Sequence, residues 1–300
     1  VLTYGHGDVI RGLEGRWADD RDPWHLDVVG ERVYGRGVAD NKGQHSINLA
    51  ALRAVLETRG SLGFNSTILL ETSEEIGSPG LHAFCEQERE ALTADLLIAS
   101  DGPRLAHDQP TLFLGTRGAL NFELELTLRD GRHHSGNWGG LLANPAIILA
   151  NAIATIADAN GRVKVRELVP QSMPNSVRAA LAGIEIKPSE SEPTIDEAWG
   201  EPGLSPAERV YGWNTFEVLA WHAGNPDNPV NAIPPSAIAY CQIRYTVDRD
   251  PDTFLGILRE HLEANGFGAI DVRASRLTSP WGDRKSTRLN SSHQIISYAV

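Results

Sequence analysis

A glycine-flanked turn that leads directly into a helix, at residues 34–43, most constrains how this chain can fold. The stretch reads YGRGVADNKG, and its one carboxylate is Asp40. Glycines on both sides allow the backbone to approach a ligand closely. The predicted helix, residues 42–56, carries apolar residues at core-facing spacing: Ile47, Leu49, Leu52 and Leu56. The pattern predicts a rigidly mounted turn that presents Asp40, although helix N-caps and phosphate loops have similar signatures.

Residues of types that commonly bind metals follow three short apolar segments, each of which is predicted to be a buried strand. They are His6 and Asp8, Glu74 and Glu75, and Asp101. The three predicted strands are residues 1–4, 66–70 and 96–99. Open α/β sheets place their sites at the carboxyl ends of strands, so we expect these side chains to lie together with Asp40.

Each of these pairs also has a simpler interpretation. A His-x-Asp segment is usually a capped turn, and adjacent glutamates usually mark a solvated face, with one of them capping the next helix. Alternatively, Asp8 is correctly spaced to orient a metal-bound His6. If one of Glu74 and Glu75 binds a cation and the other lies over it, the cation offsets their repulsion.

Composition excludes several classes of partner. A chain of 300 residues with 41% hydrophobic content is large enough for two domains with cores. The net charge of −12 argues against nucleic acid or an anionic membrane as partner. Cys85 and Cys241 are far apart and indicate neither a disulfide framework nor a cysteine zinc site. We expect a cytoplasmic protein, but the chain begins at Val1 in mid-strand, so its sequence does not show whether an export signal precedes it.

The second part of the chain follows a different pattern. Residues 120–128 alternate as a half-buried strand should. Predicted elements follow at residues 145–157 (helix), 215–221 and 237–247 (strands), 251–263 (helix) and 269–274 (strand). This β-α-β-β-α-β order predicts a ferredoxin-like domain, interrupted at residues 170–206 by an irregular excursion. We therefore predict domains at residues 1–118 and 119–276, followed by a tail at 277–300.

Residues 283–293 match, without a gap, the translation of a sequence that resembles a common short-read sequencing adapter. Residues 294–295 would be its sample index and 296–300 its continuation, and the simpler interpretation is an ordinary serine-rich basic tail. We expect this segment to pack against nothing, and we expect His293 not to be a ligand.

The assembled motifs resemble the M20 family of co-catalytic zinc peptidases and amidohydrolases, which includes carnosine-type dipeptidases, glutamate carboxypeptidases and acylamino-acid deacylases. The resemblance covers essentially all of residues 1–282. The matching motifs are, in order, His6-Gly7-Asp8-Val9; Gly35-Arg36-Gly37 with Asp40-Asn41-Lys42-Gly43; Glu74-Glu75-Ile76-Gly77-Ser78; Ser100-Asp101; and His134-Ser135-Gly136 with Gly139-Gly140 and Asn144-Pro145. The resemblance implies an α/β catalytic domain with a mixed sheet, incomplete at both ends here, and a ferredoxin-like α+β lid or dimerisation domain.

The resemblance also implies a metal centre. His6 and Asp101 would hold one zinc ion, Asp40 would bridge two, and Glu75 would hold the second together with a histidine from a C-terminal segment that this chain lacks. Nitrogen and carboxylate ligands suit zinc, and Co²⁺ or Mn²⁺ are alternatives. With that ligand missing, we expect the chain as given to be inactive or nearly so.

Catalytic roles follow from the same resemblance. Glu74 would be the general base, Asp8 would orient His6, and the Asp40–Asn41 peptide bond is expected to be cis. His134 would stabilise the oxyanion in a neighbouring protomer of a homodimer, although a surface turn histidine is the simpler interpretation. Asn231 and Arg244 match positions that bind the substrate's backbone and carboxylate.

The resulting hypothesis is dinuclear zinc-dependent hydrolysis of a dipeptide or short C-terminal substrate by an exopeptidase. An N-acyl-amino-acid deacylase would use the same metals. A non-catalytic homologue that only binds or dimerises is the alternative of another class, and the presence of Glu74 argues against it.

Overall fold

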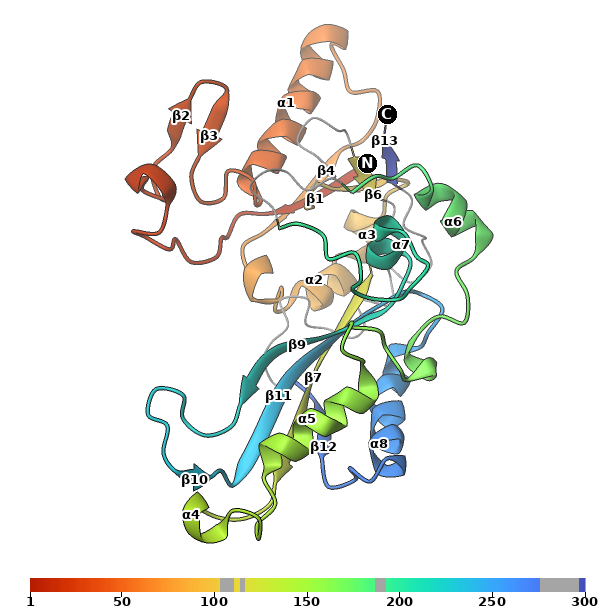
Figure 1. The fold of residues 1–300 in the computed structure, drawn as a ribbon. Coiled ribbons are helices and arrows are strands. Elements are labelled where there is room, and N and C mark those ends of the chain that lie inside the picture. The colour runs from red at the N-terminus through yellow and green to blue at the C-terminus, as the bar shows by residue number, and fades with distance from the viewer. Residues whose placement is uncertain (103–110, 114–116, 187–192, 276–296, 300) are drawn as a thin grey trace. The chain divides into compact units, whose positions relative to one another are not determined.

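The chain forms two compact units in a computed structural model that describes residues 1–102, 111–113, 117–186, 193–275 and 297–299. Of these residues, the first unit contains 1–102, and the second contains 111–113, 117–186, 193–275 and 297–299 (Figure 1). Among the described residues, no helix is both long enough and apolar enough to span a bilayer.

The first unit is built on a three-stranded parallel sheet of order β4-β1-β5. The central strand β1 (Leu2–His6) pairs with β4 (Thr67–Glu71) and β5 (Leu97–Ala99), so the predicted strands are confirmed to within one or two residues. Its helices and hairpin strands are η1 (Ala18–Asp20), β2 (Asp27–Val29), β3 (Arg32–Tyr34), α1 (Lys42–Arg59), η2 (Glu74–Ile76), α2 (Leu81–Gln87) and α3 (Arg89–Leu92). Parallel pairing places the carboxyl ends of all three strands at one edge of the sheet.

Helix α1 begins and ends close to where the sequence predicts. Gly60 follows it in the left-handed conformation (φ 75°), and its N–H donates to Leu56 O at 2.8 Å. Glycine adopts this conformation without a steric penalty, so it terminates the helix.

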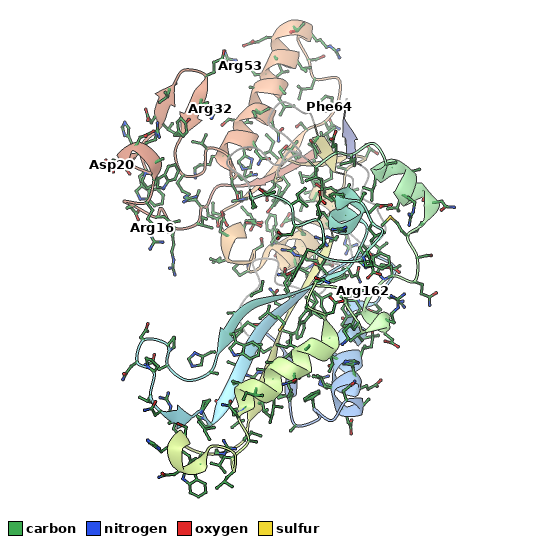
Figure 2. The ribbon with its side chains drawn as sticks, in the orientation of Figure 1. Arg16, Asp20, Arg32, Arg53, Phe64 and Arg162 are labelled. Carbon is green, nitrogen blue, oxygen red and sulfur yellow. The ribbon has the colours of Figure 1, made fainter. Side chains whose placement is uncertain are left out.

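The expected burial of α1 is wrong. Ile47 is 63% exposed, Leu49 50% and Leu56 46%. Phe64, beyond the helix, is exposed as well (Figure 2). An amphipathic face is buried only where another layer lies against it. Three short strands offer too little apolar area to cover an 18-residue helix. The turn before α1 is therefore held by hydrogen bonds of the site rather than by a helix seated in a core.

The second unit has the predicted β-α-β-β-α-β order. It consists of β7 (Gly118–Thr127), α5 (Pro145–Ile156), β9 (Thr215–His222), β11 (Ser236–Tyr245), α8 (Phe254–Ala264) and β12 (Asp271–Ala274). These strands form an antiparallel sheet of order β12-β7-β11-β9, which is the ferredoxin-like arrangement. Smaller elements are β8 (His133–His134), α4 (Ser135–Trp138), η3 (Arg166–Leu168), α6 (Asn175–Leu181), α7 (Pro206–Tyr211), β10 (Ala232–Ile233) and η4 (Pro251–Thr253).

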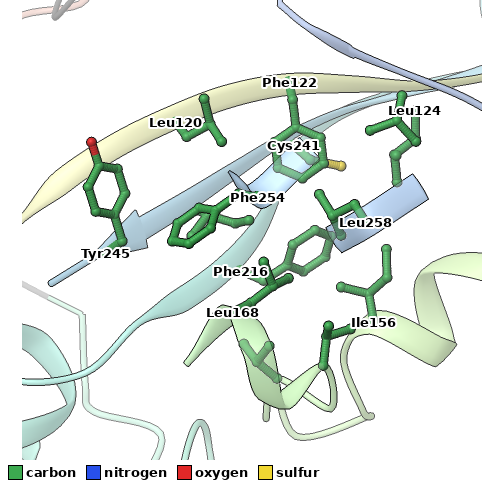
Figure 3. Packing of buried hydrophobic residues seen from close by; sticks show 14 of the residues in the cluster. Leu120, Phe122, Leu124, Ile156, Leu168, Phe216, Cys241, Tyr245, Phe254 and Leu258 are labelled. Carbon is green, nitrogen blue, oxygen red and sulfur yellow. The ribbon is translucent and has the colours of Figure 1, made fainter. Parts of the chain in front are cut away.

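The largest core of the described residues lies on one face of this second sheet. Alternate residues of β7 point inward, including Phe122 and Leu124, and pack with Phe254 and Leu258 of α8 (Figure 3). Cys241 is buried and free, and its burial raises the pKa of the thiol to about 12. Both cysteines are unpaired, as the sequence predicts.

The prediction that residues 283–300 pack against nothing is wrong for β13 (Ser297–Ala299). This strand pairs antiparallel with β6 (Thr111–Phe113), with Ser297 opposite Phe113 and Ala299 opposite Thr111. An exposed strand edge pairs through its backbone, so almost any extended segment can satisfy it. His293 lies outside the described residues.

Candidate metal centre

A histidine and several carboxylates meet at the carboxyl edge of the parallel sheet. His6 ends β1 and is only 1% exposed. Its Nε2 lies 3.0 Å from Asp40 Oδ1, 3.8 Å from Glu74 Oε2 and 3.8 Å from Asp101 Oδ2. Segments far apart in the sequence therefore supply one cluster, as the strand-end pattern predicts.

Asp8 holds the imidazole and the following glutamates together. His6 Nδ1 lies 3.1 Å from the carbonyl oxygen of Asp8 and 3.3 Å from its Oδ1. Because a carbonyl oxygen can only accept, Nδ1 carries a proton, so Nε2 would be the nitrogen that binds a metal ion when the ring is neutral. The Asp8 carboxylate also accepts the backbone N–H groups of Glu74 (3.2 Å) and Glu75 (3.0 Å). Asp8 thus connects the end of β1 to the start of η2.

The cluster contains two overlapping groups of potential ligands. His6, Glu74 and Asp101 form one, and His6, Asp40 and Glu75 form the other, with the ligand atoms of each group within 4.8 Å of one another. Asp101 is in the first group and Glu75 in the second, whereas His6 belongs to both and Asp40 only to the second. Glu74 lies within ligand range as well, so position alone does not separate a metal ligand from a base.

The turn that presents Asp40 has the backbone geometry that the sequence predicts. The Asp40–Asn41 peptide bond is cis. Gly37 has φ 84°, and the Gly43 N–H donates to its carbonyl oxygen at 3.3 Å. A Cβ on Gly43 would lie 1.8 Å from Val38 O, so no other residue fits there without displacing the backbone.

Electrostatics of the cluster favour a cation. Burial and then the Asp101 carboxylate raise the pKa of Glu74 to about 7. Burial likewise raises the pKa of Asp101 and of Glu75. Burial by itself lowers the pKa of His6, but the neighbouring carboxylates raise it by more. These shifts show that the carboxylates repel one another in a partly buried space.

Apart from His6, no cationic side chain in the described part of the chain relieves that repulsion, because none of these carboxylates pairs there with a lysine or arginine. Lys42 extends its Nζ to Gly7 O instead, at 3.2 Å. One imidazole nitrogen with several carboxylate oxygens is a donor set that zinc accepts. The residues present therefore fit a divalent metal.

Supporting residues that sequence patterns did not single out lie behind the cluster. Glu71, the last residue of β4, accepts from Ser78 Oγ at 2.8 Å and from the Tyr4 hydroxyl. His45 of α1 places its Nε2 2.7 Å from His6 O, and its ring fills the space above Gly5, where a Cβ would lie 1.6 Å from it. The position of Glu71, a charged residue at the end of a predicted strand, could have identified it as a supporting residue. No local sequence pattern identifies His45.

The three predicted site residues of the second unit fall in two places. Exposed His134 accepts the Gly136 N–H at 3.1 Å, and Ser135 N donates to Asn231 O at 2.9 Å, so His134 and Asn231 are neighbours. Arg244 lies on β11, where its Nε donates to Gln242 Oε1 at 2.8 Å. Their roles in substrate binding and catalysis stay predictions.

Comparison with known proteins adds an independent finding. The model of peptidase family M20/M25/M40 matches residues 2–265. The cysteinylglycine-S-conjugate dipeptidase of Corynebacterium striatum is 28% identical over 296 residues, which cover 94% of this chain and 62% of that protein. The β-Ala-His dipeptidase of Rattus norvegicus is 33% identical over 307 residues, covering 94% and 59%.

Solved structures agree on the fold. An M20 family metallo-carboxypeptidase from Sulfolobus solfataricus, Sso-CP2, superposes with a TM-score of 0.71 at 27% identity, covering 91% of this chain and 63% of that one. The chain spans about three fifths of the length of the two curated relatives.

Proposed function

Because this chain belongs to peptidase family M20/M25/M40, we propose that it carries the metal centre of a dinuclear zinc exopeptidase that hydrolyses dipeptides. The observation that carries this proposal is the meeting of His6 with two overlapping groups of carboxylates at one sheet edge. An uncompensated cluster of this kind is costly to bury unless it holds a cation.

We assign the ligands by donor group. His6 and Asp101 would hold one metal ion, Asp40 would be shared with the second, and Glu75 would hold the second with a further histidine expected outside this chain. When bound, the ions supply Lewis acidity and lower the pKa of water. Asp8 fixes the His6 ring so that Nε2 faces the centre.

Glu74 is assigned as the general base. It is 8% exposed, and its Oε2 lies 3.8 Å from His6 Nε2, so the carboxylate is placed beside the proposed metal position, where it can accept a proton from water. It takes the proton of the attacking water and returns it to the leaving nitrogen. His134 donates to the oxyanion in a partner protomer, while Asn231 and Arg244 bind the substrate's backbone and carboxylate.

The two relatives described above support a dipeptide rather than an N-acyl amino acid as substrate, because both are named dipeptidases. The test is a substrate panel on the full-length gene product loaded with Zn²⁺, Co²⁺ or Mn²⁺. Dipeptides should be hydrolysed with kcat/KM at least 10-fold above that for N-acetyl or N-succinyl amino acids of the same residues. The reverse preference would identify a deacylase, and the absence of any metal-dependent hydrolysis would support a binding or dimerising homologue.

A further inference from the structure

Asn41 directly follows Asp40, the proposed bridging residue, in the sequence. From its contacts we infer that Asn41 is a positioning residue, which holds the Asp101 carboxylate in the orientation that metal binding requires. This inference rests on the proposed metal centre. It concerns a residue that supplies none of the potential metal ligands itself.

The side chain of Asn41 joins the ends of two strands. It is fully buried. Its Oδ1 accepts the backbone N–H of His6 at 3.3 Å. Its Nδ2 donates to the backbone oxygen of Ser100 at 2.6 Å and to Asp101 Oδ1 at 3.0 Å. One amide thus connects the end of β1 to the segment after β5, across separations of 35 and 60 residues.

Asn41 does not do what asparagine ordinarily does at its position. It is the N-cap of α1, where an asparagine side chain typically accepts a backbone N–H of the first turn. Here the side chain makes no such bond, and the first turn of α1 is capped through the backbone oxygen of Asn41, which accepts from Gln44 N (3.1 Å) and His45 N (3.3 Å). The amide is directed away from the helix it begins and toward the centre.

The bond to Asp101 distinguishes the two oxygens of that carboxylate. Oδ1 is occupied by the Asn41 amide, whereas Oδ2 faces His6 Nε2 at 3.8 Å. A carboxylate held through one oxygen cannot rotate freely, so its other oxygen stays aimed at the predicted metal position. Partners of this kind around metal ligands typically change metal affinity by roughly 10–100-fold when removed.

Asn48 offers a matched control on the same helix. Its side chain also reaches the end of β5, with Nδ2 2.8 Å from Ser100 Oγ and Oδ1 3.1 Å from that hydroxyl, but it does not bond to Asp101. Like Asn41→Leu, Asn48→Leu replaces an asparagine that bonds to Ser100 with a leucine, so the change in side-chain volume is the same. It leaves the bond between Asn41 and Asp101 intact.

The test compares Asn41→Leu, Asn41→Ala and Asn48→Leu in the full-length protein, using Co²⁺ absorption titration, zinc content and thermal unfolding. We expect both Asn41 variants to lose about 10–100-fold in affinity at one of the two metal sites and to keep the other. Asn48→Leu should bind both ions as wild type does. The alanine variant adds no bulk, so it covers the case in which Asn41→Leu fails to fold.

Two results would overturn the inference. One is unchanged metal affinity in folded Asn41→Ala, and the other is an equal loss in Asn48→Leu, which would indicate general destabilisation of α1. Wild-type protein that binds no metal at all would instead refute the proposed function, and the two failures are therefore distinguishable.

Discussion

Glu74 and Glu75 are adjacent in sequence but are placed in different donor groups by the fold. Glu74 lies with His6 and Asp101, whereas Glu75 lies with His6 and Asp40. A bound cation would offset the repulsion between these two carboxylates, with one of them as its ligand and the other beside it. The roles of base and ligand are therefore best separated by changing each carboxylate to its neutral isostere.

We predict that Glu74→Gln retains two metal ions while kcat falls by about three powers of ten, because proton transfer to and from the reacting groups is lost. Glu75→Gln should lose one ion. Metal analysis with steady-state kinetics of both variants provides the measurement. If Glu74→Gln loses metal and Glu75→Gln does not, the two assignments are reversed.

The raised pKa of Glu74 predicts how the metal-free protein responds to pH. The ordinary pKa is 4.5 and the folded value is about 7, so between these values the folded chain holds a proton that the unfolded chain has released. The free energy of unfolding should therefore fall as pH rises through this window. His6, whose pKa is also raised, contributes in the same direction above its ordinary 6.5.

Glutamine cannot ionise, so Glu74→Gln should gain stability relative to wild type as the pH increases from about 5 to 8 in the presence of a chelator. Urea unfolding at several pH values measures this difference, and the exposed Glu57→Gln is the control. Curves for wild type and Glu74→Gln that stay parallel across the window would contradict the prediction.

At the scale of elements, short segments behind the centre hold it in place. Glu71 at the end of β4 accepts from Ser78, beyond η2, and from Tyr4 in β1. Together with the bonds of Asp8 to the first N–H groups of η2, these contacts attach the glutamate-bearing turn to the sheet. The sheet edge is thus cross-linked by side chains at the point where the carboxylates must be presented.

We predict that Glu71→Leu lowers the free energy of unfolding by about 1–3 kcal/mol, because it leaves hydroxyl groups without their acceptor in a partly buried space. Glu57→Leu removes an equally sized carboxylate from an exposed pair with Arg53 and should change stability by less than about 0.5 kcal/mol. Urea denaturation of both variants decides the comparison. Equal effects would show that Glu71 has no special structural role.

At the scale of the whole molecule, we predict that the second unit mediates a homodimer in which His134 completes the partner's site. Sedimentation of the full-length protein measures its oligomeric state. Mixing two inactive variants tests whether His134 of one protomer acts in the site of the other. Randomly formed dimers of Glu74→Gln and His134→Ala should regain about a quarter of wild-type activity, because half of them are hybrids with one intact site. An active monomer, or no recovery on mixing, would contradict this prediction.

We also predict that residues 1–300 alone hydrolyse dipeptides far more slowly than the full-length protein. The group of Asp40 and Glu75 shares its only described histidine with the other group, and carboxylates without a histidine hold zinc weakly. Exposed apolar residues of α1 and of the parallel sheet add to the expected loss of stability, at about 25 cal/mol per Å² of apolar area left in water. Activity equal to that of the full-length protein would refute this prediction.

The sequence by itself determined the local elements and the composition of the centre. Alternation in β7 and the order of its successors predict the ferredoxin-like unit, because a strand that faces one core must alternate. Strand-end positions predict that His6, Glu74 and Asp101 meet, because parallel strands share one carboxyl edge. Both predictions rest on sequence patterns that lie within a few residues of the side chains they concern.

Only the tertiary structure decided the partners of those side chains. The spacing of apolar residues in α1 predicts that one face of the helix is more apolar than the other, but not whether another layer covers the apolar face. Here Ile47 and Leu49 are exposed. The pairing of β13 with β6 depends on a free strand edge rather than on side-chain pattern. The bonds of Asn41 to His6 and Asp101 join residues that only the register of the sheet brings within hydrogen-bonding distance, so no local pattern could have predicted them.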